Sequence, residues 1–391
     1  MEESSEGPRE GEIILRMKPH TKAKHRILQE YLNAWLPIML QSWGTGRIVY
    51  LDGFAGSGVY DDGSYGSPII ALDCANNHQL RANFRGETIF IFIEIDKNRA
   101  DHLSQLLEQR YGPRDKETYA KLPKTYKVEM TNGDFNFVIK GIVEKLEKEK
   151  LDLAPTMAFI DPYGYSELDI DLLARILKFN KCELLITYMA GFIDRFASDE
   201  RHKVSIIRTL KISEDDLLKA SAIQEVEQRE LVWLKYLNNA IVNASAAMSG
   251  TPQPIYKLYF KMLDASNHTL YYLVYFTKSP KGIEVMKHAM SKAGKQWSYR
   301  FSDYDFDPRQ STILDYTNEK PWIRDEAERI YQQFRGKDAF GKEVRMFVLL
   351  ETIWSFSSQS LRLLEESGRL TCLGGRTRRF TYPETAMLRF K

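Results

Sequence analysis

The chain has few cysteines, no long apolar run and almost no excess of charge. Its 391 residues include three cysteines, Cys74, Cys182 and Cys372, which lie far apart and form no CxxC or Cys/His pair. This spacing argues against a zinc site and against a disulfide framework. No metal site is therefore expected. Sparse, unpaired cysteines fit a reducing compartment, so a cytoplasmic location is predicted.

Segments that would direct the chain to a membrane are also missing. No apolar run approaches the roughly 20 residues that cross a bilayer. The polar, acidic N-terminus is the opposite of a signal peptide, and residues 1–16 are expected to be disordered. With a net charge of +2, any nucleic-acid surface must come from local clusters of basic residues.

Apolar runs alternate with amphipathic segments over the first two thirds of the chain. Strands are predicted at 47–53, 88–95, 126–130, 156–160 and 183–189. Helices are predicted at 22–40, 67–76, 98–109, 135–149 and 169–179, with Ser67 as the N-cap of the second helix. This rhythm predicts a doubly wound α/β fold with a parallel sheet.

Two further strands, 255–262 and 269–277, are joined by only a short turn, which excludes a crossover helix. They must form an antiparallel hairpin. A parallel sheet that ends in an antiparallel hairpin is the plan of a Rossmann-like class I methyltransferase. We therefore expect residues 17–295 to form such a domain.

Three segments depart from this rhythm. Residues 199–250 are charged and amphipathic, with Trp233, Leu237 and Ile241 at four-residue spacing, and predict a helical insertion at the sheet edge. Residues 296–335 are interpreted as a linker and a helix. Residues 336–391 predict two helices and then strands 370–372 and 378–382 around a glycine turn, which is a winged-helix-like pattern.

The first strand breaks into a glycine loop. Asp52, Phe54, Ala55, Gly56, Ser57 and Gly58 follow the spacing D-x-F-x-G-x-G, which differs from the GxGxxG of NAD-binding proteins. Glycines there let the backbone pass close beneath a ligand. An ordinary strand-to-turn transition is the alternative. We interpret the loop as a site for S-adenosyl-L-methionine (SAM).

Acidic residues follow the next two strands. Glu94 is placed to accept hydrogen bonds from the two ribose hydroxyls of a cofactor. Asp96, two residues on, is better explained as a helix N-cap. Asp134 is a candidate for binding the adenine amino group while Phe135 packs on the ring, and capping of the following helix is an equal alternative for Asp134.

The fourth strand ends in Asp161-Pro162-Tyr163-Gly164, the most chemical motif of the chain. Methylation of an amine conjugated to a base ring needs an acceptor for the N–H and a ring that holds the base. Asp161 and the Pro162 carbonyl are candidate acceptors, Tyr163 a candidate stacking residue and Gly164 a candidate substrate contact. Alone, the motif is better explained as an Asp-Pro turn.

Other candidate contacts are weaker. The loop Tyr60–Gly66 is interpreted either as a substrate-gating lid, with Tyr60 touching substrate, or as a disordered connector. The basic run from Lys18 to Arg26 is interpreted as a solvated helix face in preference to a phosphate contact. Near the C-terminus, Arg376, Arg378 and Arg379 are candidate phosphate contacts, and protein contacts are the alternative.

The sequence resembles the three-Cys-motif partner (TcmP) family of methyltransferases over most of its length. The matching residues are 50–58, 66–68, 92–94, 159–164, 272–277 and Gly282. The resemblance implies a SAM-binding domain and a partner protein that carries a three-cysteine motif distinct from this chain's cysteines. The Asp-Pro-Tyr-Gly tetrad is also similar to that of tRNA guanine-N2 dimethyltransferases. It has one proline where DNA adenine methyltransferases have two.

The sequence therefore predicts a SAM-dependent methyltransferase that acts on an amino group, with a nucleic-acid base favoured as acceptor and RNA favoured over DNA. The alternative is a non-catalytic nucleic-acid-binding or defence-complex subunit that keeps the methyltransferase fold. No membrane partner is expected.

Overall fold

The computed structural model describes residues 11–41, 46–162, 168–197, 199–249, 254–294, 300–303 and 322–391. These residues form two compact units, one of residues up to 294 together with 300–303 and one of residues 322–391. Three predictions lie outside the described residues: disorder over residues 1–10, and the roles of Tyr163 and Gly164.

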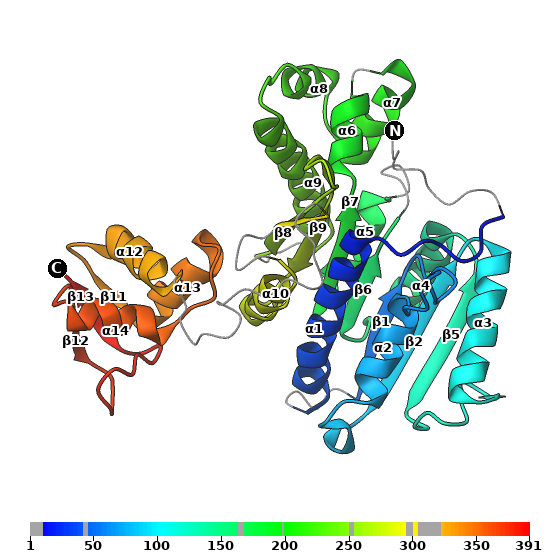
Figure 1. The fold of residues 1–391 in the computed structure, drawn as a ribbon, viewed down its shortest axis with the longest axis horizontal. Coiled ribbons are helices and arrows are strands. Elements are labelled where there is room, and N and C mark those ends of the chain that lie inside the picture. Colours follow the sequence, from blue (N-terminus) through cyan, green and yellow to red (C-terminus); the bar gives the residue numbers. More distant parts are fainter. Residues whose placement is uncertain are drawn as a thin grey trace. The chain divides into compact units, whose positions relative to one another are not determined.

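The first unit is built on an eight-stranded sheet with the order β10-β8-β9-β7-β6-β1-β2-β5. Figure 1 shows this sheet at the centre of the unit. Its strands are β1 (Arg47–Asp52), β2 (Glu87–Glu94), β5 (Tyr126–Asn132), β6 (Thr156–Ile160), β7 (Cys182–Tyr188), β8 (Tyr256–Leu263), β9 (Thr269–Thr277) and β10 (Arg300–Ser302).

Strands β5, β2, β1, β6 and β7 run parallel, β9 is antiparallel to β7, and β8 is antiparallel to β9. The predicted parallel sheet closed by an antiparallel hairpin is therefore confirmed, as is the α/β fold class. The sequence analysis missed β10, which pairs with β8, and the short hairpin of β3 (Arg114–Asp115) and β4 (Thr118–Tyr119). These strands are two or three residues long and carry no alternating apolar pattern.

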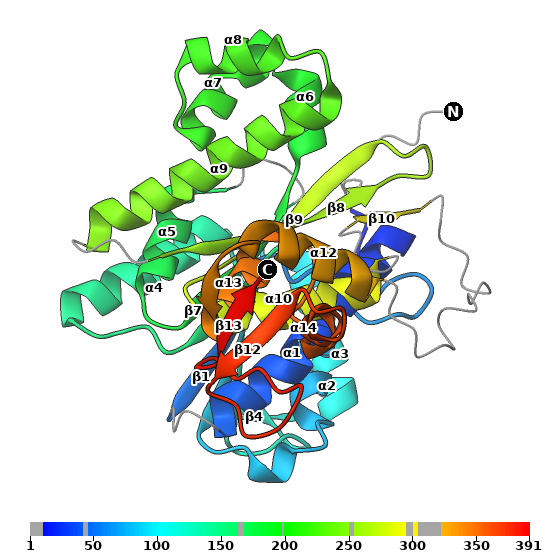
Figure 2. The same cartoon turned by 90° about the vertical axis from the view of Figure 1, so that its left-hand side faces the viewer.

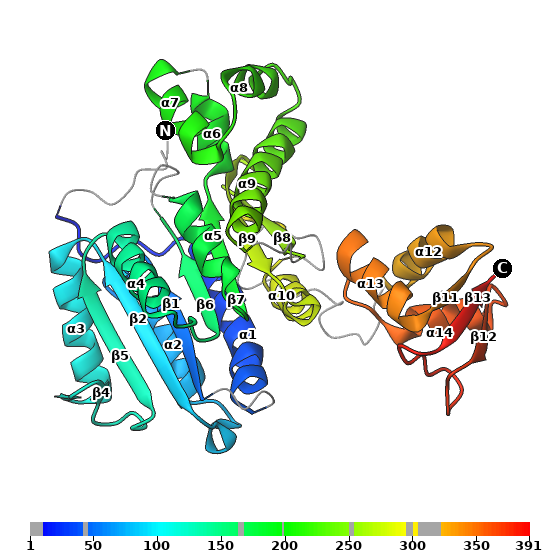
Figure 3. The same cartoon turned by 180° about the vertical axis from the view of Figure 1, so that it is seen from behind.

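Helices cover both faces of the sheet. One face carries α1 (Pro19–Gln41), α2 (Ser67–Asn76) and α10 (Pro280–Ala293), with α1 packed against the other two. Figure 1 shows α1 and α2 in front of the sheet, whereas α4 (Phe135–Glu149) and α5 (Ile170–Lys178) lie in front in the opposite view of Figure 3. Helix α3 (Lys97–Tyr111) packs on β2 and β5. The N-cap of α2 is Gly66, not Ser67 as predicted.

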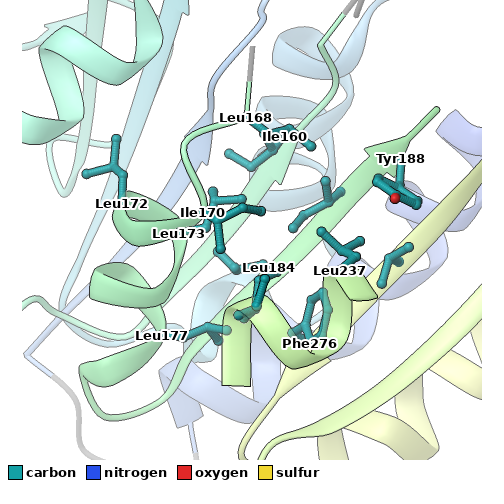
Figure 4. Close-up of a cluster of buried hydrophobic side chains, with 14 of the residues drawn as sticks. Ile160, Leu168, Ile170, Leu172, Leu173, Leu177, Leu184, Tyr188, Leu237 and Phe276 are labelled. Carbon is teal, nitrogen blue, oxygen red and sulfur yellow. The ribbon is translucent and has the colours of Figure 1, made fainter. Parts of the chain in front are cut away.

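The core beneath α4 and α5 follows the two-residue period of the strands. Residues 182, 184, 186 and 188 of β7 all point into it, together with alternate residues of β1, β6 and β9. Figure 4 shows Leu184 and Phe276 of the sheet facing Leu173 and Leu177 of α5 and Leu237 of α9. Because both faces of these strands are covered, their sequences are almost wholly apolar.

Helix α9 (Val226–Ser249) lies over this face of the sheet and packs along α5. Trp233, Leu237 and Ile241 are buried in the core, as their spacing predicted. The insertion is therefore helical, but its position at the sheet edge was predicted wrongly for α9. Three shorter helices, α6 (Ala190–Phe196), α7 (Glu200–Leu210) and α8 (Glu214–Ser221), gather at one end of α9, as Figure 2 shows.

A buried carboxyl group explains one glycine of the family resemblance. Glu183, at the start of β7, accepts hydrogen bonds from the hydroxyls of Tyr31 and Thr277. A Cβ on Gly282 would lie 2.7 Å from the Glu183 Oε1 atom and 2.6 Å from the Tyr275 hydroxyl. Gly282 is thus required by packing at the end of the sheet opposite to the glycine loop.

The second unit contains α12 (Trp322–Phe334), α13 (Gly341–Glu351) and α14 (Ser358–Glu366) beside a three-stranded sheet, β11-β13-β12. Strands β11 (Asp338–Phe340), β12 (Leu370–Gly374) and β13 (Met387–Phe390) are antiparallel to their neighbours. The strand predicted at 378–382 is wrong, because β12 pairs with 387–390 instead. Leu388 and Phe390 are the alternating apolar pair that reaches the core.

The helix predicted within residues 296–335 is α12, and it belongs to this second unit. Its Ala327 and Ile330 are buried in the same core as the residues of α13 and α14. Its Glu326 carboxylate accepts hydrogen bonds from the Ser357 N–H (3.0 Å) and the Ser360 hydroxyl (2.6 Å), which ties α12 to α14. The predicted boundary at residue 336 therefore lies too far along the chain. Among the described helices of both units, none is long and apolar enough to cross a membrane.

Candidate functional site

The chain changes direction across the sheet between β1 and β6. From β1 it passes outward to β2 and β5, and then returns to β6 on the other side of β1. In open α/β sheets, ligands bind outside the carboxyl ends of the strands at such a point. Asp52 ends β1 beside Phe159 of β6, and the Gly53 N–H donates to the Phe159 carbonyl (3.0 Å). The glycine loop and Asp161 thus start from neighbouring strand ends.

A cavity that is open to solvent lies at this place. It joins the two motifs that lie about a hundred residues apart in the sequence. Its lining residues are Leu15, Phe54, Ala55, Gly56, Ser57, Gly58, Val59, Tyr60, Gly66, Ser67 and Asp161.

The glycine loop has one open and one crowded glycine. Both Gly56 (φ +64°) and Gly58 (φ +80°) adopt the left-handed backbone conformation that favours glycine. Apart from Gly56 itself and its two chain neighbours, no described atom lies within 4 Å of a Cβ built on Gly56, so this Cβ would face open space. A Cβ on Gly58 would lie 2.6 Å from the Cδ1 atom of Leu103 on α3. Gly56 therefore leaves room for a ligand, whereas Gly58 lets the loop approach α3.

Alanine substitutions should separate these two roles. In both variants, alanine in the left-handed backbone conformation destabilises the folded state by about 1–2 kcal/mol. In Gly58→Ala, Leu103 must also move, which costs about 1–3 kcal/mol more. We expect Gly58→Ala to lower the free energy of unfolding in urea more than Gly56→Ala does. Conversely, for the same loss in free energy of unfolding, Gly56→Ala should lower the affinity for a ligand more than Gly58→Ala does. Equal losses of stability would contradict the assignment.

Glu94 holds the glycine loop from behind. Its carboxylate is 3% exposed and accepts hydrogen bonds from the Gly56 N–H (2.8 Å) and the Asp96 N–H (2.9 Å). A carboxylate offers about four acceptor positions, so two remain for other donors. The ribose role predicted for Glu94 stays a prediction, and the structure adds a second role in shaping the loop.

The other acidic candidates at this edge cap helices. Asp96 is the N-cap of α3 and accepts from the Arg99 N–H (3.0 Å), as its preferred interpretation predicted. Asp134 is the N-cap of α4 and accepts from the Phe137 N–H (2.8 Å). Of the two interpretations of Asp134, capping is therefore observed, and contact with adenine remains a prediction.

Phe135 is buried beneath the glycine loop. Its ring lies 5.5 Å from that of Phe54, and its Cδ2 atom would be 2.6 Å from a Cβ on Gly53. This ring supports the loop instead of presenting an open face to adenine. Exposed apolar side chains nearby in the sequence are Ile95, directly after β2, and Phe137, in the first turn of α4. The sequence analysis did not single out these two residues.

The remaining loop residues are fixed by hydrogen bonds. The Ala55 N–H donates to the Ile93 carbonyl (2.9 Å), and the Ser57 hydroxyl donates to the Val59 carbonyl (3.1 Å). The imidazole Nδ1 of His102 on α3 lies 2.9 Å from the Ser57 carbonyl oxygen. The loop is thus held to β2 and α3 while its backbone lines the cavity.

The Asp161 carboxylate is held on both oxygens. Oδ1 accepts a hydrogen bond from the Thr187 hydroxyl of β7 (2.5 Å), and Oδ2 forms an ion pair with the Lys24 ammonium of α1. Pro162, the next residue, is buried. Two of the four acceptor positions of the carboxylate are thereby used, which leaves two for a group that enters the cavity.

Sequence reasoning missed Lys24 and Thr187 as neighbours of Asp161. Lys24 was placed within a solvated basic face, but its side chain is only 9% exposed, and His25 beside it is buried as well. A clue was available, because Lys24 falls one helical turn before Leu28 on the apolar stripe of α1. The solvated-face interpretation is therefore wrong for Lys24 and His25, while Lys22 and Arg26 are exposed.

Three more polar groups lie around this ion pair. The Lys24 Nζ atom is 5.5 Å from the centre of the Tyr271 ring, and Tyr271 is buried. Among the described residues, the Tyr271 hydroxyl has no hydrogen-bond partner. The negative charges of Asp161 and Asp303 act on this hydroxyl and, after burial, help raise its pKa. Asp303 lies 2.7 Å from the Nδ1 atom of His20, whose ring contacts that of Tyr271.

Asp52 has an unusual pKa for an aspartate. Burial raises its pKa from 3.8 to about 7, against the hydrogen bonds that lower it, and the charge of Asp161 adds to the increase. Its side chain is fully buried, with the Phe54 N–H and the Tyr50 hydroxyl each 3.4 Å away. Asp52 therefore carries a proton for a large part of the time near neutral pH.

This shift makes stability depend on pH. Because the folded pKa exceeds the unfolded value, the folded state binds the proton more tightly, and stability falls as pH rises from the unfolded pKa through the folded one. Relative to Asp52→Asn, the wild type should lose about 2 kcal/mol between about pH 5 and about pH 8. Urea unfolding of both proteins at the two pH values measures this difference. A constant difference would show that Asp52 is ionised throughout.

The predicted lid is an ordered hairpin. Val59 pairs with Tyr65, and the Tyr60 N–H donates to the Ser64 carbonyl (2.9 Å). The N-terminal segment crosses it, since Leu15 pairs with Tyr60 and the Met17 N–H donates to Asp61 (2.8 Å). Neither a disordered connector at 60–66 nor disorder at 11–16 is therefore correct. Tyr60 does line the cavity, as its predicted role requires.

The arginines of the second unit have different surroundings. Arg376 forms two hydrogen bonds of 2.7 Å with Glu365, and Glu365 also accepts from the Tyr382 hydroxyl (2.6 Å). This pairing lowers the pKa of Glu365. The charge of Arg376 is therefore balanced by a carboxylate of the same unit. Arg378 and Arg379 are exposed, and Arg379 lies over the Phe380 ring (4.7 Å). These two residues remain candidates for phosphate contacts.

Within the described ranges, no group of three or more His, Cys, Asp or Glu side chains is arranged to hold a metal ion. All three cysteines are free thiols, and burial raises the pKa of Cys74 and Cys182 to about 12.

Comparisons with known proteins give only weak similarities. No model of a known protein family matches the chain, and no curated protein sequence matches it. Similar solved structures include Trm1 from Pyrococcus horikoshii with S-adenosyl-L-methionine, at 12% identity and a TM-score of 0.39, over 69% of this chain and 59% of that one.

Two more are PKMT2 from Rickettsia typhi in complex with AdoHcy and residues 942–1257 of StiE O-MT. PKMT2 has 8% identity and a TM-score of 0.26, over 88% of this chain and 73% of that one. StiE O-MT has 12% identity and a TM-score of 0.22, over 71% and 83%. These similarities are too weak to assign a ligand to this chain.

Proposed function

We propose that the protein is a SAM-dependent methyltransferase that acts on an amino group, with a nucleic-acid base as the favoured acceptor and RNA favoured over DNA. One observation carries this proposal. The glycine loop and Asp161, which come from β1 and β6, line a single cavity at the point where the strand order reverses. A cofactor loop and an acceptor for an amine N–H are thus brought together.

The residues present fit such a cofactor. Gly56 leaves open space over its backbone, and Glu94 keeps acceptor positions free beside it. The exposed side chains of Ile95 and Phe137 are available as apolar surface at the ends of β2 and β5. When bound, SAM supplies a methyl group on a positively charged sulfur. A cationic ligand nearby would favour the ionised form of Asp52, whose pKa is raised to about 7 by burial.

Asp161 supplies the acceptor side of the chemistry. A free acceptor position on its carboxylate takes an N–H of the incoming amine, which directs the nitrogen lone pair towards the methyl group. Thr187 and Lys24 fix the carboxylate from two sides, so that its orientation is set before the substrate enters. The Pro162 carbonyl is the second candidate acceptor.

The second unit supports a nucleic-acid substrate. Its order of helix, strand, two helices and two strands is consistent with the predicted winged-helix-like domain. Arg378 and Arg379 are exposed. Exposed arginines of this kind are suited to contact the phosphate groups of a nucleic acid. A three-Cys-motif partner protein and membership of the TcmP family remain predictions from the sequence.

Calorimetric titration tests the cofactor part of the proposal. S-adenosylhomocysteine should bind to the wild-type chain, and Gly56→Asp should abolish binding because its carboxylate enters the open space of the cavity. A wild-type chain that binds neither SAM nor S-adenosylhomocysteine would contradict the proposal.

Transfer of radiolabelled methyl groups tests the acceptor part. Total RNA should become labelled more strongly than DNA, and a protein fraction should not. Labelling of DNA alone would contradict the preference for RNA. If the chain binds S-adenosylhomocysteine but labels neither nucleic acid nor protein, the alternative of a non-catalytic binding subunit becomes the better explanation.

A further inference from the structure

Lys24 places a positive charge beside Asp161, whose carboxylate the proposed reaction uses as its acceptor. Its side chain is nine-tenths buried, and its ammonium group pairs with Oδ2 of Asp161. Oδ1 of the same carboxylate is held by the Thr187 hydroxyl. A buried ion pair of this kind is costly to break, because removing one partner leaves an unpaired charge in the interior. The pair is therefore present when an acceptor arrives.

Three titratable groups around this pair are mainly uncharged below about pH 7. His25, next to Lys24, is buried, and burial lowers its pKa to about 3, so it is neutral at physiological pH. The Tyr271 phenol keeps its proton because burial raises its pKa. Asp52 is largely protonated below about pH 7. Asp303 is a further carboxylate and lies 2.7 Å from the Nδ1 atom of His20. Among these groups, Lys24 is the cation that contacts Asp161 directly.

The subsite offers polar contacts through Asp161. Asp161 lines the cavity, and two acceptor positions of its carboxylate are not used by Thr187 and Lys24. A hydrogen bond to this paired carboxylate suits a neutral amine. A protonated alkylamine would instead meet the like charge of Lys24.

We infer that Lys24 determines the acceptor class: by neutralising Asp161 it makes the subsite select an uncharged, conjugated amine over an ammonium group. This inference rests on the proposed function. It favours amino groups on aromatic rings or amides, such as those of nucleobases, over lysine side chains and polyamines. Lys24 acts here through Asp161 and is therefore a positioning residue.

A cofactor analogue tests the inference without a known substrate. Sinefungin carries an ammonium group where SAM carries its methyl group, whereas S-adenosylhomocysteine carries no charge there. Calorimetry gives the ratio of the two dissociation constants. We expect similar affinities in the wild type. In Lys24→Met, which keeps the buried stem but removes the charge, sinefungin should gain about tenfold over S-adenosylhomocysteine.

Lys22→Met is the matched control. Lys22 lies on the same helix but is exposed and pairs with Asp62 at 2.7 Å, so its loss changes the net charge equally and should leave the ratio unchanged. Lys24→Arg keeps the charge and should keep the wild-type ratio. The double variant Lys24→Met/Asp161→Asn has no unpaired charge and should return the ratio to within about threefold of the wild type.

The outcomes separate this inference from the proposed function. If the wild type fails to bind S-adenosylhomocysteine, the proposed function is wrong. Suppose instead that the wild type binds it, but the ratio of dissociation constants does not shift about tenfold in Lys24→Met or does not return in the double variant. The role of Lys24 is then wrong, while the proposed function stands. A wild type that already prefers sinefungin tenfold would also overturn the role of Lys24.

Discussion

Asp161→Asn should lower methyl transfer about a hundredfold or more while cofactor binding persists, because positioned acid–base groups contribute about 10²–10⁴-fold to rates. The substitution keeps the shape of the side chain. However, an amide has one oxygen where the carboxylate has two, and its nitrogen donates. Lys24 and Thr187 already donate to this group, so the amide cannot satisfy both of them and also accept from a substrate.

Transfer of labelled methyl to RNA under single-turnover conditions, with calorimetry of S-adenosylhomocysteine on the same preparations, measures both quantities. Asp169→Asn is the matched control. Asp169 is an exposed N-cap of α5 that accepts from the Leu172 N–H (3.0 Å), and asparagine caps helices equally well. The control should retain full activity. An Asp161→Asn enzyme as active as the control would remove Asp161 from the chemistry.

Glu94→Ala should weaken the binding of S-adenosylhomocysteine by roughly 30-fold or more, since a lost hydrogen bond to a charged group costs about 1.5–3 kcal/mol and Glu94 makes more than one. The variant leaves the Gly56 and Asp96 N–H groups without their partner and removes the candidate ribose acceptor. We also expect a lower melting temperature. Both effects follow from the same carboxylate.

Glu94→Gln separates the two effects. Its single amide oxygen can accept from one of the two N–H groups, so the loop should be damaged less than in Glu94→Ala. Calorimetry of both variants, with thermal unfolding of each, gives the comparison. If Glu94→Ala binds S-adenosylhomocysteine as tightly as the wild type, Glu94 has a structural role only, and the proposed contact with the ribose is wrong.

The fold could be predicted from the sequence where the sequence pattern is periodic. Strand 156–160 and helix 135–149 were predicted to the residue, because apolar runs and amphipathic stripes reflect burial on two faces or on one. The errors have local causes. The strand predicted at 378–382 was based on aromatic and arginine residues that lie outside the sheet. The alternating apolar residues of the observed strand are Leu388 and Phe390.

The site could be predicted only as two separate loops. The glycine loop and Asp161 were found because each directly follows a strand, and the order of the strands then places the two side by side. The partners of Asp161 could not be found in this way. Lys24 comes from a helix 137 residues earlier, and Thr187 from the neighbouring strand, so no spacing in the sequence connects them.

The sequence by itself determined the α/β class, the antiparallel closing hairpin and the two motifs at strand ends, because these depend on residue periodicity and on connections too short to cross the sheet. Tertiary structure decided which charges meet. It buried Lys24 against Asp161, made Asp134 a helix cap and paired Arg376 with Glu365. The physical reason is that the charge and hydrogen bonding of a side chain depend on its burial and on its neighbours in space. Neither can be derived from the residues that are adjacent in the sequence.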